Sequence, residues 1–344
     1  MNAPKLRFKE FNDEYINLKY KDVLKIKSGK DQKKVECESG IYPILGTGGQ
    51  IGKTNSFLYD KPSVLIGRKG TINKPQYMET PFWTVDTLFY SHIYEPNIPK
   101  YLFYSFQNVN WKKYDESTGV PSLSSSTIES VECNIPSKEE QLKVADFLSL
   151  LDKKIELQSK KIEDLKLFKL CINNILFNGN KTVKLKDICE CKSSTISLSD
   201  IEYDDGIYPI YGANGEIKKI NSYQNDKDYL AIIKDGAGVG KTIICNKKSS
   251  IIATLSALIP NGIPVYYFNE LINKIDFSKY IVGSGIPHIY FKDYSNEKLY
   301  LHEEKMRILI NNLFKKIIIK IELEENKLHL LETLKKGLMQ NMFV

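Results

Sequence analysis

The stretch Lys138–Phe177 (KEEQLKVADFLSLLDKKIELQSKKIEDLKLFKLCINNILF) decides the fold, because forty residues without proline or glycine predict one long helix. Apolar residues recur along it at alternating spacings of four and three. They form two series, Val144, Leu151, Gln158, Leu165, Ile172 and Leu148, Ile155, Ile162, Lys169, Leu176, in which only Gln158 and Lys169 are polar. A stripe with this 3.5-residue period is typical of a helix that packs against a partner helix in a coiled coil.

The partner helix is predicted in the same chain, 166 residues later. The two series return there as Ile310, Ile317, Glu324, Leu331, Leu338 and Phe314, Ile321, Leu328, Lys335, Met342. The polar interruptions fall at the same places, which favours one duplicated, intramolecular pair over two unrelated core helices. A two-fold axis that relates two domain-plus-helix halves reverses one helix, so we expect the two helices to pack antiparallel.

The duplication extends over most of the chain. Gly40–Ile44 (GIYPI) recurs as Gly206–Ile210, and Gly119-Val120-Pro121 recurs as Gly285-Ile286-Pro287, again at an offset of 166. The globular part of each half contains short β-branched and aromatic runs between Gly, Asn and Pro turns, which predict strands. The runs are Ser63–Ile66, Trp83–Tyr90, Tyr229–Ile233 and Ser250–Ile259.

These patterns predict an α+β protein with two tandem β-rich domains, each followed by a long helix. The expected segments are residues 1–137, a first helix over 138–178, a second domain over 179–300 and a second helix over 301–344. Ser137 and Glu140 have the spacing of a capping box before the first helix, and Asn178-Gly179 is suited to end it.

Composition and charge exclude several classes of protein. A net charge of +7 in 344 residues favours an acidic partner only weakly. The six cysteines form no CxxC pair, so a structural zinc site is not expected. The N-terminus lacks the apolar core of a signal peptide, which predicts a cytoplasmic protein without a membrane segment.

The motif Gly236-Ala237-Gly238-Val239-Gly240-Lys241-Thr242 invites comparison with a phosphate-binding loop. That loop requires glycine where this chain has Asp235, and the repeat partner of Gly236 is Gly70, in a stretch that is no phosphate loop. The cluster Gly46–Gly49 likewise lacks the third glycine of a dinucleotide-binding fingerprint. The four histidines show no metal-ligand or nucleophile pattern, so neither a catalytic site nor a metal or cofactor site is expected.

The glycine clusters are interpreted as tight turns that let backbone approach a flat or charged partner, although for any single glycine a plain hairpin turn is the better explanation. Basic and amide side chains, which suit phosphates and base edges, lie next to them. The candidate DNA contacts are Gln50, Lys53, Arg68, Lys69 and Lys74 in the first half and Asn214, Lys218, Lys219, Lys234 and Lys241 in the second.

An ordered set of motifs resembles a known family. The set comprises Tyr42–Gly49 (YPILGTGG), Leu65–Ile72 (LIGRKGTI), Phe82–Thr87 (FWTVDT), Gly119–Leu123 (GVPSL), Ile135–Gln141 (IPSKEEQ), Tyr208–Gly215 and Leu338–Phe343 (LMQNMF). With these motifs the chain resembles the specificity (S) subunit of Type I restriction–modification systems. It departs from the family pattern at Asp235, where a basic residue is common, and at Thr254–Leu258.

The resemblance implies a non-catalytic DNA-recognition subunit. Two target-recognition domains would each read one half of an asymmetric, bipartite sequence in double-stranded DNA, with the paired helices as a spacer. Two methyltransferase (M) subunits would dock on the chain, and restriction (R) subunits would join through them. S-adenosylmethionine, ATP and Mg would belong to those partners.

Two other hypotheses have the same helix architecture. A Type IIB-like specificity subunit would pair with a fused nuclease–methyltransferase, and the sequence of that partner would distinguish it. A protein-only coiled-coil adaptor would give no sequence-dependent footprint on DNA. A free-standing enzyme is disfavoured because catalytic motifs are missing.

Overall fold

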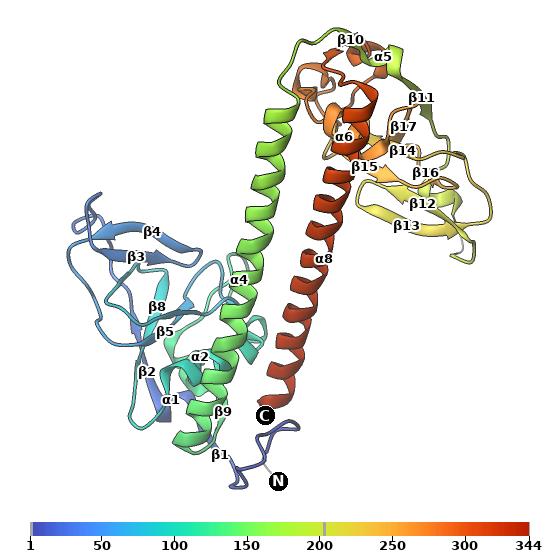
Figure 1. The fold of residues 1–344 in the computed structure, drawn as a ribbon. Helices are drawn as coiled ribbons and strands as arrows, with labels where there is room; N and C mark the ends of the chain where they lie inside the picture. Colours follow the sequence, from blue (N-terminus) through green and yellow to red (C-terminus); the bar gives the residue numbers. More distant parts are fainter. Residues whose placement is uncertain (1–2, 202–203, 344) are drawn as a thin grey trace. The chain divides into compact units, whose positions relative to one another are not determined.

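The computed structural model describes residues 3–201 and 204–343, and its longest elements are the helices α4 (Lys138–Leu176) and α8 (Glu304–Met342), shown in Figure 1. The Ser137 Oγ accepts a hydrogen bond of 3.4 Å from the Glu140 amide, which is one half of the predicted capping box. The Glu140 carboxylate binds elsewhere, accepting from Arg7 Nε at 2.8 Å and from the Tyr15 hydroxyl at 2.9 Å. Glu140 therefore ties the N-terminal segment to the start of α4.

The chain forms two compact units, and each takes part of both long helices. The first unit contains the residues up to Gln158 and those from Lys327 onward, and the second contains Ser159–Asn326. The four segments expected from the sequence stay a prediction, because these units divide the helices instead of ending at them.

The described residues of the first unit form three small sheets. β1 (Ile16–Lys19) pairs with β9 (Glu132–Ile135). A four-stranded sheet has the order β2 (Leu24–Ser28), β8 (Leu88–Ile93), β5 (Ser63–Gly67), β6 (Gln76–Met78), and a three-stranded sheet has the order β4 (Gly49–Thr54), β3 (Tyr42–Gly46), β7 (Trp83–Thr84). The short helices are α1 (Tyr20–Val23), α2 (Pro99–Asn108), η1 (Trp111–Tyr114) and α3 (Ser125–Ser130).

The second unit repeats this topology. β10 (Val183–Lys184) pairs with β18 (Lys298–Leu299). The larger sheets run β11 (Cys189–Ser193), β17 (Leu255–Pro260), β14 (Tyr229–Ile233), β15 (Thr242–Cys245) and β13 (Gly215–Ile220), β12 (Tyr208–Gly212), β16 (Ser250–Ile251). The short helices are α5 (Leu185–Ile188), η2 (Leu198–Asp200), α6 (Val265–Ile272), η3 (Phe277–Tyr280) and α7 (Phe291–Tyr294).

Two of the predicted strands are each two strands that belong to different sheets. The run Trp83–Tyr90 turns where the Leu88 amide donates to the Val85 carbonyl at 3.0 Å, which separates β7 from β8. The run Ser250–Ile259 turns in the same way, with the Leu255 amide bonded to the Ile252 carbonyl at 3.0 Å. Each run lacks glycine and proline at its turn, where the residues are Asp86-Thr87 in the first run and Ala253-Thr254 in the second, so no strong turn signal divides either run.

In the first unit, the end of α8 completes the core of the globular domain. Val144 and Leu148 of α4 are buried in one cluster with Met339, Met342 and Phe343. The Phe343 ring lies 5.3 Å from the Tyr101 ring of α2. Early α4 residues thus share a cluster with late α8 residues, which is antiparallel packing.

The second unit uses the end of α4 in the same way. Phe177 is the counterpart of Phe343 at the offset of 166. Its ring lies 5.2 Å from that of Tyr267 and 6.4 Å from that of Phe314 near the start of α8. The two helices therefore run antiparallel in this unit as well.

The predicted seam positions are buried or half-buried. Val144, Leu148, Leu151, Ile162, Ile310, Phe314, Ile317, Ile321 and Leu331 are buried, and Ile155, Leu165 and Leu328 are half-buried. The polar seam residue Glu324 is 4% exposed, and its carboxylate lies 2.8 Å from both Lys161 Nζ and Lys320 Nζ. Two ammonium groups thus compensate the charge that the seam buries.

The predicted fold class is confirmed: two β-rich domains, each followed by a long helix, with the helices packed antiparallel. No helix among the described residues is long and apolar enough to cross a membrane.

We predict that Phe343→Ala loosens the first unit selectively, by about 3 kcal/mol, because it removes an aromatic side chain from that core. Amide hydrogen exchange should accelerate in residues 15–135 and stay unchanged in residues 183–300. Phe168→Ala, at a residue 54% exposed, is the matched control and should leave both regions protected. Equal loosening of both regions by Phe343→Ala would contradict the role of the α8 end.

Candidate nucleic-acid interface

A loop after β5 in the first unit carries two of the predicted DNA contacts, Arg68 and Lys69, and both side chains are exposed. The loop is fixed through its backbone. The Arg68 carbonyl accepts from the Leu123 amide at 2.9 Å, and the Gly70 amide donates to the Pro121 carbonyl at 2.8 Å. Gly70 has φ = 87°. A residue with a side chain is strained in this conformation, so glycine suits the turn.

The tip of the β3–β4 hairpin lies beside this loop. The Thr47 hydroxyl oxygen is 3.8 Å from the position that a Cβ would take on Gly70. Gln50 and Lys53 are exposed on β4, which leads away from the tip. Residues from two strand connections are therefore gathered at one edge of the domain.

A third segment, residues 115–122, crosses the loop and is ordered by one carboxylate. Asp115 Oδ1 accepts from the Ser122 amide at 2.9 Å, the Ser117 amide at 3.0 Å and the Ser117 hydroxyl at 2.9 Å. These bonds, the one from the Ser122 amide first, lower the pKa of Asp115 below its ordinary value, so the carboxylate stays charged at neutral pH. Residues Gly119–Ser122 of this segment are called its crest, and Val120 in the crest is 66% exposed.

The second unit builds the same arrangement from different side chains. The Gly236 amide donates to the Pro287 carbonyl at 2.9 Å, and the Ile289 amide donates to the Lys234 carbonyl at 3.0 Å. Gly236 has φ = 90°. The loop–crest pairing of the first unit is thus repeated bond for bond at the offset of 166.

The side chains on this common backbone differ between the units. Lys234 stands where the first unit has Arg68, Asp235 where it has Lys69, and His288 where it has Ser122. A fixed backbone with exchanged side chains is the arrangement expected of two recognition sites that read different ligands.

The glycine-rich segment of the second unit cannot serve as a phosphate-binding loop. A strand, β15, follows it where the phosphate loop opens a helix. Its amides are also engaged: those of Gly236, Gly240 and Lys241 donate to the carbonyls of Pro287, Ile233 and Gly238. The structure thus supports the rejection of nucleotide binding there.

Three further candidates lie on or next to β13 in the second unit. Asn214, at the β12–β13 turn, and Lys219, on β13, are exposed like Gln50 and Lys53 in the first unit. Lys218 is half-buried, and its ammonium group donates to the Ile201 carbonyl at 2.7 Å, which anchors a neighbouring segment.

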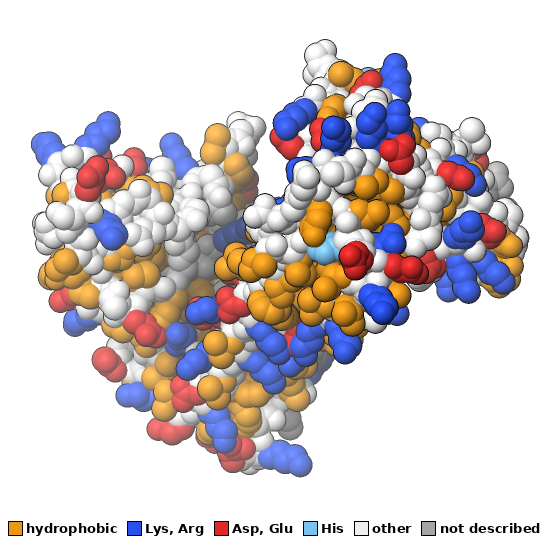
Figure 2. Space-filling view, turned by 45° about the horizontal axis from the view of Figure 1, so that its top comes forward, with side chains coloured by type: hydrophobic (Ala, Val, Ile, Leu, Met, Phe, Trp, Pro, Cys, Tyr) orange, Lys and Arg blue, Asp and Glu red, His pale blue; other side chains and the backbone are white. Residues whose placement is uncertain are grey.

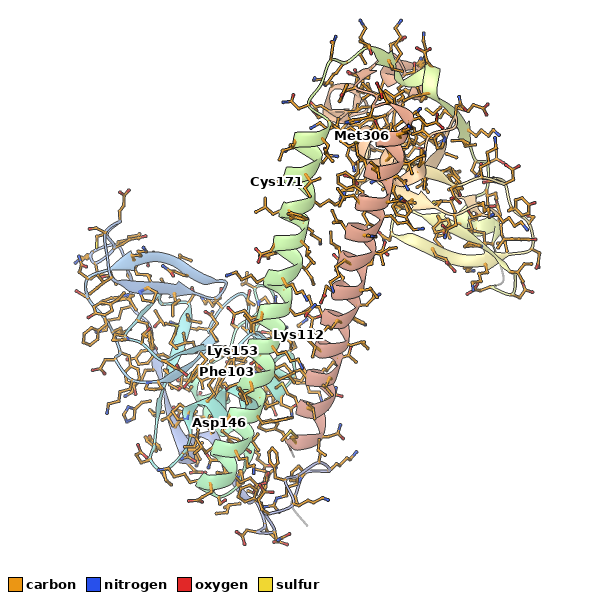
Figure 3. All side chains as sticks on the ribbon, in the orientation of Figure 1. Phe103, Lys112, Asp146, Lys153, Cys171 and Met306 are labelled. Atoms are coloured by element: carbon orange, nitrogen blue, oxygen red, sulfur yellow. The ribbon has the colours of Figure 1, made fainter. Side chains whose placement is uncertain are left out.

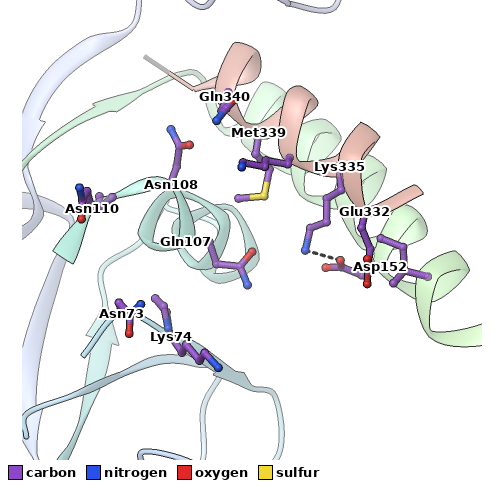
Figure 4. Close-up of a pocket in the computed structure, with 14 residues that line it drawn as sticks. Asn73, Lys74, Gln107, Asn108, Asn110, Asp152, Glu332, Lys335, Met339 and Gln340 are labelled. Carbon is purple, nitrogen blue, oxygen red and sulfur yellow. Dashed lines mark ion pairs between the residues drawn. The ribbon is translucent and has the colours of Figure 1, made fainter. Parts of the chain in front are cut away.

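The last two candidates, Lys74 and Lys241, lie away from the loops and crests and line pockets beside the long helices. Lys74 lines a cavity of about 690 Å³ together with Lys335 and Lys336 of α8, shown in Figure 4. Lys241 lines the corresponding cavity of about 580 Å³ with Lys166 and Lys169 of α4. The structure therefore does not bring these two lysines together with the crest residues.

The crests themselves, Gly119–Ser122 and Gly285–His288, are not among the candidate contacts predicted from the sequence. The signal was present, because the Gly-[Val/Ile]-Pro motif is duplicated in step with the loop glycines. Its pairing with those loops became visible only in the backbone hydrogen bonds.

Comparison with known proteins agrees with the duplicated architecture. The family model for the Type I restriction modification DNA specificity domain matches the chain twice, at residues 12–167 and 178–333. No curated protein matches the chain. Within the described residues, no group of three or more His, Cys, Asp or Glu could hold a metal ion.

Solved structures share the fold. One is a Type-I restriction-modification system S subunit from M. genitalium, which is 18% identical in sequence to this chain. The match covers 99% of this chain and 99% of the S subunit, with a TM-score of 0.78. Another is a chain from a structure that describes complex assembly and conformational transition of the type I R-M system, and it is 13% identical. The match covers 94% of this chain and 96% of that solved chain, with a TM-score of 0.52.

The two family matches leave only the ends and a short connection uncovered, and each spans one globular domain with most of its helix. The chain therefore belongs to the Type I restriction–modification DNA specificity family, as a non-catalytic subunit that recognises target DNA within the restriction–modification complex.

Proposed function

We propose that each unit reads one half of a bipartite, asymmetric DNA target through its loop and crest. The observation that carries this proposal is the repetition of one backbone arrangement with different side chains. Arg and Lys suit guanine edges and phosphates, and Asn and Gln suit adenine edges. Arg68 and Lys69 are exposed, and Lys234 and Asp235 are half-buried. The two units accordingly read different sequences, which makes the whole target asymmetric.

The second unit favours an amino-bearing base at one position. Asp235 replaces Lys69 in the repeated loop, and a carboxylate accepts a hydrogen bond from the cytosine N4 amino group. The same carboxylate is repelled by a guanine O6, which is also a hydrogen-bond acceptor, and by a phosphate, which is also negatively charged. The exchange of Lys69 for Asp235 therefore changes the kind of base that this loop accepts.

The partners that we propose are two methyltransferase subunits, and they dock on the outer faces of the long helices. Leu157 of α4 and its counterpart Leu323 of α8 are each 59% exposed, and Phe168 and its counterpart Leu334 are 54% and 52% exposed. Leu157 and Phe168 are 11 positions apart on α4, and Leu323 and Leu334 are 11 positions apart on α8, a spacing that returns to one face of a helix. Figure 2 shows hydrophobic side chains at the surface among lysines and arginines.

This outer stripe is distinct from the seam. The labelled residues Asp146, Lys153 and Cys171 in Figure 3 are also exposed on α4, so the surface around the stripe is mostly solvated. Apolar side chains that recur on a solvated helix face favour a further helix as the occupant. Because the stripe is duplicated, it suits two copies of one partner.

Restriction subunits then join through the methyltransferases, and S-adenosylmethionine, ATP and Mg bind those partners. A Type IIB-like system, with nuclease and methyltransferase in one partner chain, uses the same surfaces. The family assignment argues against a protein-only adaptor.

We predict that Arg68→Ala relaxes discrimination at one base of one half-site by ~1–3 kcal/mol, because it removes a guanine contact. Lys69→Ala should instead weaken binding to all sequences and lower the salt slope by about one unit, as expected for a phosphate contact. Lys234→Ala is the matched variant in the second unit and should act only on the other half-site.

The measurement is binding of the assembled methyltransferase complex to DNAs with single substitutions in each half, at several salt concentrations. Relaxation in both halves by Arg68→Ala, or an unchanged profile, would refute the assignment of this loop.

We predict that Leu157→Glu and Leu323→Glu each remove one methyltransferase subunit from the complex, and that the double variant removes both. Burying the new carboxylate in an apolar interface is costly, whereas both sites are exposed in the isolated chain. Stoichiometry by native mass spectrometry and thermal melting are the measurements.

The control for these substitutions is Ile16→Glu, at an exposed apolar residue of β1, which should keep both subunits. A double variant that still binds two methyltransferases, with unchanged melting, would show that the stripe is not the docking surface.

A further inference from the structure

The two lysines that interrupt the helix seam at equivalent positions meet different carboxylates. Lys169 Nζ lies 2.6 Å from Glu270 Oε1, on helix α6 of the second globular domain. Lys335 Nζ lies 2.5 Å from Asp152 Oδ1, on the long helix α4 (Figure 4). Both lysine side chains are mostly buried, at 22% and 19% exposure.

The carboxylate has changed elements between the repeats. At the offset of 166, Glu270 corresponds to Tyr104 on α2, and Asp152 corresponds to Ile318 on α8. The first unit therefore has Tyr and Asp where the second has Glu and Ile. One negative charge is kept beside each lysine, although it comes from a different helix.

Tyr104 restores the link to the globular domain that Glu270 makes in the second unit. Its hydroxyl donates to Asp152 Oδ2 at 2.7 Å, and Lys335 Nζ lies 5.6 Å from the centre of its ring. Burial raises the pKa of Tyr104, so the hydroxyl keeps the proton that it donates. In both units a lysine of the seam is thus joined to the first helix that follows the reading sheets.

In the second unit the contacts continue to the strand that ends the reading loop. Asn269 Nδ2 donates to Glu270 Oε1 at 2.9 Å, and the Thr242 hydroxyl donates to Asn269 Oδ1 at 2.8 Å. Asn173 Nδ2 of α4 also donates to Glu270, to its carbonyl at 2.9 Å and to Oε2 at 3.1 Å. Thr242 begins β15, directly after the loop that carries Lys234 and Asp235.

The Lys169, Lys335 and Glu270 side chains are mostly buried and that of Asp152 is 35% exposed, and stability alone poorly explains these two ion pairs. An apolar pair of the same volume is often as stable as a buried ion pair or more so, whereas a directional ion pair specifies one arrangement. Retention of a lysine at both seam positions, with a compensating exchange of its partners, points to a role in orientation.

We propose that Lys169 and Lys335 are positioning residues that fix the orientation of each globular domain on the long helices, acting through Glu270 and through Tyr104–Asp152. The proposal rests on the proposed function, because orientation is useful only if each domain presents its loop to DNA. A fixed orientation makes the complex sensitive to the number of base pairs between the half-sites.

The test compares the full chain, assembled with its methyltransferase subunits, on DNAs whose half-sites are separated by the native spacer or by one base pair more or fewer. Lys335→Met removes the charge and keeps the volume of the side chain. We expect it to reduce discrimination between the spacers by roughly tenfold, with the base preference inside each half-site retained. Lys336→Met, at the exposed neighbouring residue, should behave like the parent chain.

The rescue experiment transplants the second unit's arrangement into the first. The double variant Tyr104→Glu/Asp152→Ile supplies Lys335 with a glutamate on α2, as Lys169 has on α6, and we expect parental spacer discrimination. Lys169→Met in the second unit gives an independent arm if the double variant does not fold.

The possible outcomes separate the two claims. Parental spacer discrimination in both Lys335→Met and Lys169→Met, or equal loss of affinity for all spacers with lowered melting, overturns the positioning role and leaves DNA recognition standing. Absence of sequence-dependent binding by the parent complex overturns the proposed function itself.

Discussion

The constraint on which the structure depends is that neither globular domain completes its own core. The first requires Met339, Met342 and Phe343 from the end of α8, and the second requires Phe177 from the end of α4. Each helix therefore has to traverse the seam before its last aromatic residue reaches the other domain's core. Helix pairing is thus a condition for folding of the domains as well as a connection between them, and an apolar seam of 3.5-residue period supplies the driving force.

With the cores fixed in this way, the recognition edges are free to vary. The loops are held by backbone bonds, such as Gly70 to Pro121 and Gly236 to Pro287, which do not depend on the side chains next to them. Lys234 replaces Arg68, and Asp235 replaces Lys69, while both backbone bonds between loop and crest are kept. A duplicated scaffold of this kind separates the requirement for folding from the requirement for specificity.

The duplication made most of the fold predictable from the sequence. Matching defects at Lys169 and Lys335 identified the helix pair, and the repeated GIYPI motif located both reading domains. The turns inside Trp83–Tyr90 and Ser250–Ile259 were missed because neither contains the glycine or proline that usually marks a turn. Lys74 was expected beside the reading loops, but it lines a pocket with α8, since sequence proximity to a glycine turn does not define the direction of a side chain. The DNA contacts themselves stay predictions.

The partners of the seam lysines show a limit of comparing repeats position by position. An ion pair requires only that opposite charges approach closely, and the acid can reside on any element that borders the lysine. Glu270 and Asp152 occupy unrelated positions in the repeat. An alignment of the two halves would therefore record the loss of an acid at two positions, whereas the structure keeps one carboxylate beside each lysine. Tyr104 makes the exchange possible, because its hydroxyl reaches Asp152 while its ring covers the ammonium group. The two halves have therefore diverged in sequence under a common electrostatic requirement, and that requirement lies where each domain meets the long helices.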